Sequence, residues 1–377
     1  MEGVAMSEVS VMNPGFWKCK RVLLTGHTGF KGSWLALWLS ELGATVTGLG
    51  LAPDTKPHLF NQLKLENRLH SHQLADIRDA QALAAVVART QPELVLHLAA
   101  QPLVRRSYDD PLGTWATNVQ GSLNLLEALK PLQHPCAVVM VTTDKVYANQ
   151  EWDYGYRECD RLGGHDPYSA SKAAAELAIA SWRASFCGNG VHQTPNLSIA
   201  TARAGNVIGG GDWAPDRIVP DVMRALAEGM PISLRNPTAT RPWQHVLEPL
   251  SGYLLLAESL FAEAESHIGD DRYASAFNLG PSLEANRSVR ELVEAVLQHW
   301  SGSWLDCSDP YNPHEAGRLH LQIDKAHHQL CWQPRWDFAT TVNRTVRWYR
   351  SVHEGVNPLE ICLSDLELYL ASVPHGN

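Results

Sequence analysis

The sequence predicts an α/β protein built on a doubly wound parallel sheet, with a smaller C-terminal substrate-binding lobe. Three observations support this fold class. Short apolar runs alternate with segments of helical periodicity between residues 21 and 205, the runs are apolar at nearly every position, and the first run ends in a glycine-rich turn. Strands that are apolar throughout are typical of parallel sheets covered by helices on both faces.

The first βαβ unit covers residues 21–51, with a strand over 21–26, a helix over 33–42 and a second strand over 44–51. Three helix–strand pairs come after it: 79–89 with 93–100, 114–129 with 137–144, and 168–186 with 197–205. A short third strand is expected just before Asp76. The repeated order of helix and strand predicts that all these strands run in parallel.

Composition and charge exclude several classes of function. Lys and Arg number 31 against 40 Asp and Glu, and no basic run is interleaved with aromatic residues, so a nucleic-acid partner is not expected. No apolar run is long enough to span a bilayer and the first residues lack the order of a secretory signal, which predicts a cytoplasmic protein without a membrane partner. The seven cysteines are scattered without a CxxC pair, so neither a disulfide framework nor a metal site is predicted.

Gly26, Gly29 and Gly32 stand in GxxGxxG spacing where the first strand meets the first helix. Glycines at this junction let backbone amides approach a pyrophosphate at the N-terminus of the helix, although the same spacing also serves tight helix–strand packing. Asp76 could accept a hydrogen bond from an adenine amine, and the small residues of 97–100 leave room for a cofactor. The second strand ends without an acidic or a basic residue, which favours NAD over NADP.

These observations divide the chain into a flexible leader over 1–18, an NAD-binding Rossmann-like domain over 19–205, and a region over 206–377 that is mainly the substrate-binding lobe. Segments near 241–280 are expected to return to the Rossmann-like domain, because they contain an apolar helical run and a short apolar strand.

Tyr168 and Lys172 form a YxxxK motif at the start of a predicted helix, which places both side chains on one face about one turn apart. A neighbouring ammonium group favours the phenolate, so we expect the pKa of Tyr168 to fall below its usual value of about 10. Thr143, at the end of the fifth strand, is a ready partner for a substrate hydroxyl. A helix-surface pair of Tyr and Lys is the alternative, but the sheet and the glycine turn favour a catalytic pair.

Further motifs accompany these residues: HLAAQ (97–101), TN (117–118), TTD (142–144), YSASK (168–172) and RAGNV (203–207). Together they make the sequence resemble the extended short-chain dehydrogenase/reductase family over most of residues 20–350. Within that family, TTDKVY, LGGHDPYSASKAAAEL, GNVIGGGDWAPDRIVPD and RPWQHVLEPLSGYL look more like the dehydratases acting on CDP-glucose than those acting on other nucleotide sugars. The resemblance implies NAD as cofactor, CDP-glucose as substrate, and a homodimer packed through the helices at 114–129 and 168–186.

The implied reaction is a redox-neutral dehydration to CDP-4-keto-6-deoxyglucose. Tyr168, assisted by Lys172, would take the proton of the sugar 4-hydroxyl while C4 passes a hydride to NAD, and Thr143 would position that oxygen. Asp144 would protonate the oxygen that leaves C6, provided that burial keeps it protonated, and the hydride would then return to C6. Related dTDP-sugar dehydratases have Glu after this Asp as the base at C5. This chain has Lys145, which either acts as that base or only contacts substrate oxygens.

The resemblance also implies two sets of ligand contacts. The substrate would be held by Asn206 and, at its diphosphate, by Arg217, Arg241 and His245. The NAD contacts would be Gly26, Thr28, Gly29, Phe30, Gly32, Asp76, Ile77, Leu98, Ala99, Ala100, Gln101, Thr117, Tyr168 and Lys172.

Three other functions stay open: a dehydratase for another nucleotide hexose, a nucleotide-sugar 4-epimerase, and a non-catalytic dinucleotide-sensing protein. An epimerase needs no acid at C6, so Asp144 disfavours it, and the presence of Tyr168 and Lys172 disfavours the sensing protein.

Overall fold

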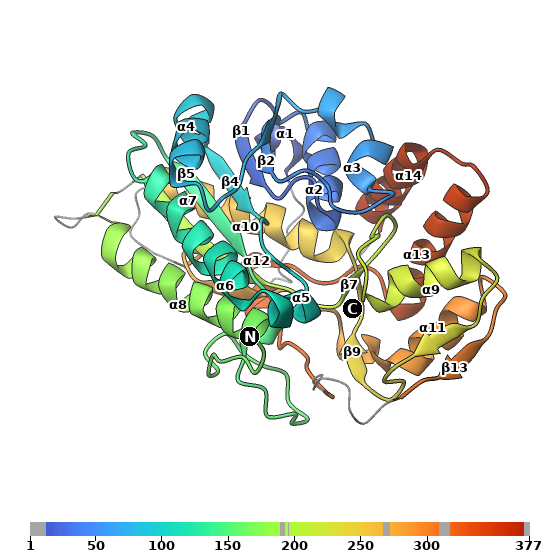
Figure 1. Cartoon of the computed structure of the whole chain (residues 1–377). Coiled ribbons are helices and arrows are strands. Elements are labelled where there is room, and N and C mark those ends of the chain that lie inside the picture. Colours follow the sequence, from blue (N-terminus) through green and yellow to red (C-terminus); the bar gives the residue numbers. More distant parts are fainter. Residues whose placement is uncertain (1–12, 189–192, 195, 267–271, 309–316, 373–377) are drawn as a thin grey trace, which may run out of the picture.

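The computed structural model describes residues 13–188, 193–194, 196–266, 272–308 and 317–372. Its centre is a seven-stranded sheet with the strand order β11-β6-β5-β4-β1-β2-β3 (Figure 1). Every pair in it is parallel. The strands are β1 (Arg21–Thr25), β2 (Thr45–Gly50), β3 (Ser71–Leu74), β4 (Leu94–His97), β5 (Cys136–Val141), β6 (Leu197–Arg203) and β11 (Ala276–Asn278). The chain winds outward from β1 in both directions, which confirms the predicted doubly wound sheet.

The core lies on both faces of this sheet, because successive side chains of a strand point to opposite sides. Leu23 and Val138 pack under α4 (Ala80–Thr90), α7 (Gly121–Leu129) and α8 (Pro167–Phe186). Their neighbours Leu24 and Val139 pack under α2 (Phe30–Glu41) and α10 (Leu247–Ser266). Figure 1 shows these two layers on either side of the sheet. The apolar character of each strand is therefore a result of double burial.

The C-terminal lobe gathers beside the carboxyl edge of the sheet (Figure 1). It contains three two-stranded pairs: β7 (Val207–Ile208) with β10 (Gln244–His245), β8 (Ile232–Leu234) with β13 (Trp304–Asp306), and β9 (Thr240–Pro242) with β12 (Asn286–Ser288). Its helices include α9 (Ile218–Ala227), α11 (Val289–Leu297), α13 (Phe338–His353) and α14 (Pro358–Ala371). The segment between β10 and β12 leaves the lobe, since α10 covers the sheet and β11 extends it beside β6. A domain boundary at residue 205 remains a prediction.

The shorter elements connect this framework: α1 (Pro14–Trp17), α3 (Leu59–Gln62), η1 (Leu65–Asn67), α5 (Val104–Asp109), α6 (Pro111–Trp115), η2 (Ala116–Gln120), η3 (Asp144–Val146), η4 (Leu283–Ala285) and α12 (Asp324–Leu330). Within the described residues, no helix combines the length and the apolar character needed to cross a membrane.

The flexible leader predicted over residues 1–18 is wrong for its last part. Residues 14–17 form α1, which Asn13 caps through its side chain, and Trp17 is fully buried in the main core. The backbone amide of Asn13 also donates to Glu258 on α10. Residues 1–12 lie outside the described residues.

The helix predicted over 114–129 is interrupted. Between α6 and α7, η2 is a π-helical turn. Asn118 in this turn accepts a hydrogen bond from the Gln101 amide at 2.8 Å and donates to the Ser171 hydroxyl at 2.9 Å. A π turn inserts one extra residue into a helix and changes the direction of its side chains. Here it connects the loop after β4 with the start of α8.

Candidate active site

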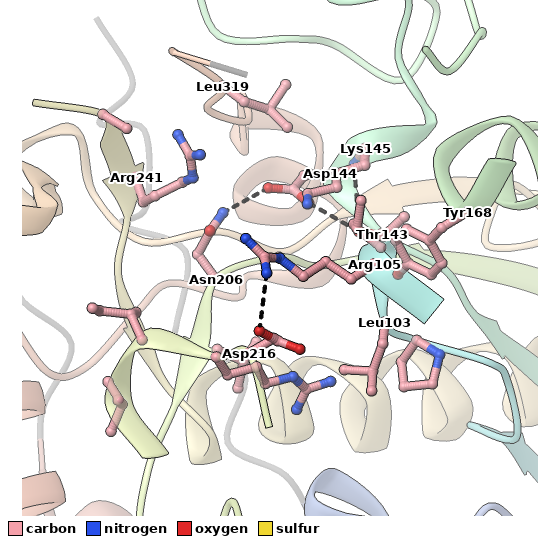
Figure 2. Close-up of a pocket in the computed structure, with 18 of the residues that line it drawn as sticks. Leu103, Arg105, Thr143, Asp144, Lys145, Tyr168, Asn206, Asp216, Arg241 and Leu319 are labelled. Carbon is pink, nitrogen blue, oxygen red and sulfur yellow. Dashed lines mark hydrogen bonds and ion pairs between the residues drawn. The ribbon is translucent and has the colours of Figure 1, made fainter. Parts of the chain in front are cut away.

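The carboxyl edge of the sheet opens into a cavity of about 1270 Å³ that is lined by both the sheet and the C-terminal lobe. Ligands of open α/β proteins bind at this edge, because the loops after the parallel strands meet there. The volume exceeds the roughly 300–1,000 Å³ of ordinary small-molecule pockets, so an extended ligand can enter. The lining residues include Thr143, Asp144, Lys145, Tyr168, Asn206, Arg217 and Arg241, several of which are labelled in Figure 2.

A buried carboxylate, that of Asp144, lies in the wall of this cavity. Asp144 lies three residues after the end of β5 at Val141. Its two oxygens accept hydrogen bonds from the Thr143 hydroxyl at 2.9 Å and from Nδ2 of Asn206 at 2.8 Å (Figure 2). Asn206 has φ +52°, a left-handed conformation that Asn tolerates better than most residues. Gly205 leaves the space for the carboxylate, because a Cβ atom at this position would overlap it. The residues after β5 and β6 thus fix one acid in the cavity wall.

Tyr168 lies beside this acid at the start of α8. Asp166 caps α8 by accepting from the Ser169 amide at 2.9 Å, and Pro167 occupies the first turn, so the helix begins just before Tyr168. Thr143 lies beside Tyr168 in the cavity wall (Figure 2). Thr143 therefore bonds to Asp144 and lies beside Tyr168, the two candidate proton-transfer groups.

Lys172 lies one turn along α8, but its ammonium group donates to the Val141 carbonyl at 3.2 Å. Burial raises the pKa of Tyr168 to about 12, and the nearby Thr143 hydroxyl offsets this only in part. Burial also lowers the pKa of Lys172 to about 8. The expectation that Lys172 lowers the pKa of Tyr168 is therefore wrong for this structure, because the ammonium is directed to the end of β5 and the phenolate is poorly solvated.

A buried ion pair connects α8 to the neighbouring strands of the sheet. Glu176 and Arg203 are each at most 4% exposed and lie 2.8 Å apart, and Glu176 also accepts from Thr142 at 2.5 Å and Thr201 at 2.9 Å. Arg203 in turn donates to the Tyr147 hydroxyl at 2.8 Å. This network links α8 to the ends of β5 and β6, the elements whose neighbouring residues include Tyr168, Asp144 and Asn206.

The glycines of the turn between β1 and α2 have two different roles: two are required by close packing, and one leaves space beside the backbone. Gly26 has φ +73°, and a Cβ atom there would lie 2.7 Å from the Ala99 amide nitrogen, while a Cβ at Gly32 would overlap the Gly26 carbonyl. Gly29, which caps α2, meets nothing closer than 3.5 Å. Packing thus requires Gly26 and Gly32, whereas Gly29 leaves a free approach to the N-terminus of α2. This arrangement fits the pyrophosphate of a dinucleotide.

The other residues predicted to contact NAD lie in the segments after β1, β3 and β4 and in η2. Thr28, Phe30, Leu98, Ala99, Ala100 and Gln101 belong to the segments after β1 and β4, and Thr117 belongs to η2. Ile77 packs into the core, and its side chain touches Gly121. The Asp76 carboxylate accepts from the Arg78 guanidinium at 2.6 Å, and this hydrogen bond lowers its pKa. The contacts of these residues with a cofactor stay a prediction.

Of the residues predicted to hold a diphosphate, two line the cavity. Arg217 is paired with Asp212 at 2.9 Å, and Arg241 donates to the Thr240 carbonyl at 2.8 Å. His245 is fully buried between the rings of Trp34 and Trp336, and burial lowers its pKa to about 3. The prediction for His245 is therefore wrong, because a fully covered and neutral imidazole neither meets nor neutralises a phosphate.

The family assignment comes from comparison with known proteins. A profile of the family described as "GDP-mannose 4,6 dehydratase" matches residues 23–345. The chain belongs to this family. The resemblance to extended short-chain dehydrogenases/reductases is thereby confirmed.

Two relatives of this dehydratase-family chain are instructive. A CDP-glucose 4,6-dehydratase from Salmonella typhimurium is 43% identical over 364 residues, covering 96% of this chain and 99% of that protein. A dTDP-glucose 4,6-dehydratase from Streptomyces antibioticus is 30% identical over 290 residues, covering 76% and 78%.

The fold is shared with solved structures. A dTDP-glucose 4,6-dehydratase from Streptomyces venezuelae, solved with NAD bound, is 26% identical and covers 90% of this chain and 99% of that one at a TM-score of 0.73. A UDP-glucose 4-epimerase from Thermotoga maritima, solved with UDP-glucose, covers 88% and 99% at a TM-score of 0.73, but its 20% identity supports the fold alone.

Lys31 is a cavity residue that the sequence analysis missed. It stands inside the glycine turn of this dehydratase-family chain and lines the same cavity as Asp144 and Arg217. Its ammonium donates to the Tyr253 hydroxyl at 3.4 Å, and burial together with the charges of Lys172 and Arg217 lowers its pKa to about 7. The sequence did contain a signal for Lys31, because it is a charged residue between Gly29 and Gly32 of the glycine motif. A residue that only packs at this position would be apolar.

Proposed function

We propose that this protein is an NAD-dependent nucleotide-sugar 4,6-dehydratase, a hydro-lyase that converts CDP-glucose to CDP-4-keto-6-deoxyglucose and water. The observation that carries this proposal is the cluster of Tyr168, Thr143 and Asp144 in one cavity, where Thr143 donates a hydrogen bond to Asp144 and lies beside Tyr168. An oxidation at C4 needs a base at the 4-hydroxyl, and an elimination across C5 and C6 needs a separate acid at the C6 oxygen. This cluster offers one group for each task.

The proposed roles are based on this geometry. Tyr168 removes the proton of the 4-hydroxyl, and the Thr143 hydroxyl orients that oxygen because it lies beside the phenol in the cavity wall. Asp144, 1% exposed and bonded to Thr143 and Asn206, gives its proton to the departing C6 oxygen. Lys145 lines the same cavity and is our candidate for the base at C5, where the ketone at C4 acidifies the proton. Lys172 holds the end of β5 against α8.

NAD fits the open N-terminus of α2 at Gly29, and its proposed contacts are those predicted from the sequence. Bound NAD would supply the hydride acceptor, which is regenerated when the hydride returns to the sugar, and one positive charge. CDP-glucose is favoured over dTDP-glucose because the relative named for CDP-glucose is more similar and is covered almost completely. Asn206, Arg217 and Arg241 are the proposed substrate contacts.

A turnover assay tests this function. Purified protein is incubated with CDP-, dTDP-, UDP- and GDP-hexoses, with and without added NAD, and the alkali-induced absorbance of a 4-keto sugar is measured. We expect product from CDP-glucose. Product from another nucleotide hexose alone would overturn the choice of base, and a 4-epimer without any 4-keto-6-deoxy sugar would overturn the dehydratase.

A homodimer in the cytoplasm is part of the same proposal. Apolar side chains are exposed on α6 and α8, with Leu112 at 82%, Trp115 at 41% and Leu177 at 61%, and a second copy of the chain would cover them. The seven cysteines are scattered along the sequence without a CxxC pair, which is typical of proteins of a reducing compartment. Light scattering on the protein and on Leu177→Glu tests the interface. We expect a dimer that the substitution weakens, and a monomeric parent would exclude it.

A further inference from the structure

Two arginines from opposite walls of the cavity share a single carboxylate oxygen. Oδ1 of Asp216 lies 3.4 Å from Nη1 of Arg105 and 3.1 Å from Nη1 of Arg235. Arg105 belongs to α5, on the side of the sheet domain, whereas Asp216 precedes α9 and Arg235 comes after β8 in the lobe. All three residues line the cavity, and Figure 2 shows the ion pair between Arg105 and Asp216.

The two cavity arginines already proposed as substrate contacts have closer partners, whereas Arg106 forms only a long, exposed ion pair with Asp54 at 3.8 Å. Arg217 is held by Asp212, whose side chain is only 6% exposed, and Arg241 donates to the backbone carbonyls of Thr240 and Gly317. The ion pairs of Asp216 are different, because the three side chains are between 37% and 44% exposed. Ion pairs that solvent reaches to this extent are weak and exchange partners readily.

The backbone of Asp216 is also unusual. Its φ is +61°, in the left-handed region that costs energy for most residues other than glycine and is tolerated by Asn and Asp. In this conformation the carboxylate is directed at both guanidinium groups. Two guanidinium groups around one anionic oxygen form the arrangement with which arginines bind a phosphate, which offers each of them further oxygens.

We propose that Asp216 occupies the place of an anionic oxygen of the substrate diphosphate, and that Arg105 and Arg235 transfer from Asp216 to the diphosphate when the nucleotide sugar binds. This inference rests on the proposed function, since it requires a substrate with a diphosphate. The exchange replaces one carboxylate by a group of higher charge and leaves the arginines paired throughout. It also joins the wall that carries α5 to the lobe through the ligand.

Binding measurements separate this exchange from a simple surface ion pair. The probes are CDP and cytidine, titrated calorimetrically into the NAD-loaded protein and its variants. We expect Arg105→Gln and Arg235→Gln each to weaken CDP binding by about ten- to a hundredfold, the contribution of a charge-assisted hydrogen bond, and to leave cytidine binding unchanged. Arg290→Gln is the matched control, because Arg290 forms an exposed ion pair with Glu294 on α11 and does not line this cavity.

The substitution Asp216→Asn should change CDP affinity in the opposite direction. Asn tolerates the same backbone conformation and keeps the shape of the side chain, so only the competing charge is lost. We expect CDP to bind about two- to fivefold more tightly, which is the range of an exposed ion pair. This gain in CDP affinity should be absent when Asp216→Asn is added to Arg105→Gln. If removing Asp216 acted only through the net charge of the cavity, the same gain would be measured in the double variant.

The outcomes distinguish the two proposals. If the parent converts CDP-glucose while both arginine variants bind CDP within twofold of it, the inference is wrong and the function stands. Weaker binding of CDP by Asp216→Asn also overturns the exchange, because Asp216 would then position the arginines instead of competing with the ligand. A parent that neither binds a nucleoside diphosphate nor turns over a nucleotide hexose overturns both.

Discussion

The substitution Gly205→Ala tests the role of the Asp144 carboxylate without changing the acid itself. A Cβ atom at position 205 would overlap all three atoms of that carboxylate, far inside the 3.4 Å at which ordinary contact begins, so the group must move by about 1 Å or more. Such a shift breaks its hydrogen bonds to Thr143 and Asn206, now 2.9 and 2.8 Å long. A misplacement of about 1 Å costs about a hundredfold in rate, and crowding costs about 1–3 kcal/mol of stability.

The assay tracks both halves of the reaction with CDP-glucose. Loss of water should slow by about a hundredfold, while oxidation at C4 continues and reduced cofactor accumulates, because that step does not use Asp144. Asp144→Asn, which keeps the shape but cannot supply the proton, should stall at the same stage. In an Asp144→Ala background the added methyl group meets no carboxylate, so Gly205→Ala should have little further effect.

The reasoning would be refuted by Gly205→Ala protein that forms 6-deoxy product within threefold of the parent rate while remaining folded. An equal further loss in the Asp144→Ala background would also count against it, because the damage would then come from the backbone and not from the acid. Thermal unfolding of each variant distinguishes a displaced carboxylate from a protein that fails to fold.

Three further outcomes are expected. Tyr168→Phe should lower the turnover number by about two to four orders of magnitude and leave CDP affinity unchanged by calorimetry; turnover within tenfold of the parent would exclude Tyr168 as the base. Glu176→Gln should lower the free energy of unfolding in urea by about 3–5 kcal/mol, because Arg203 is left buried without its counter-charge, and the double variant Glu176→Leu with Arg203→Met should restore most of it. Lys31 changes its pKa from 10.5 to about 7 on folding, so between these values the unfolded chain binds the extra proton and stability rises with pH. Lys31→Met should therefore raise the melting temperature more at about pH 6.5 than at about pH 9.5, and an equal gain at both would contradict the shift.

The parallel sheet could be predicted because its signals are local. Apolar runs and helical periodicity define each βαβ unit, and GxxGxxG marks the turn after β1. The start of α1 carries a local signal as well, since Asn13 precedes Pro14 in the order typical of a helix cap. The leader prediction missed that signal, and also that the burial of Trp17 depends on distant parts of the core.

The parts of the site that could not be predicted depend on contacts between distant segments. His245 is covered by Trp34 and Trp336, which approach it from α2 and from the loop before α13. The spacing of YxxxK places Tyr168 and Lys172 on one helical face but does not reveal which acceptor the ammonium meets. Arg105 and Asp216 form an ion pair only because the lobe lies against the loop side of the sheet, a juxtaposition that no local sequence pattern predicts.

The π turn between α6 and α7 has a consequence for the helix pair. Each residue added to a helix rotates the next segment by about 100°, so this turn sets the phase of α7 independently of α6. Leu112 on α6 can thus face outward while Leu125 and Leu129 on α7 stay in the core. Deleting one residue of η2 would give a regular α-helix from α6 to α7. In that helix Asn118 and Leu125 could not both keep their positions, so either the hydrogen bond to Gln101 would be lost or Leu125 would leave the core. The turn therefore lets Asn118 bond to the loop after β4 while α6 and α7 bury different faces.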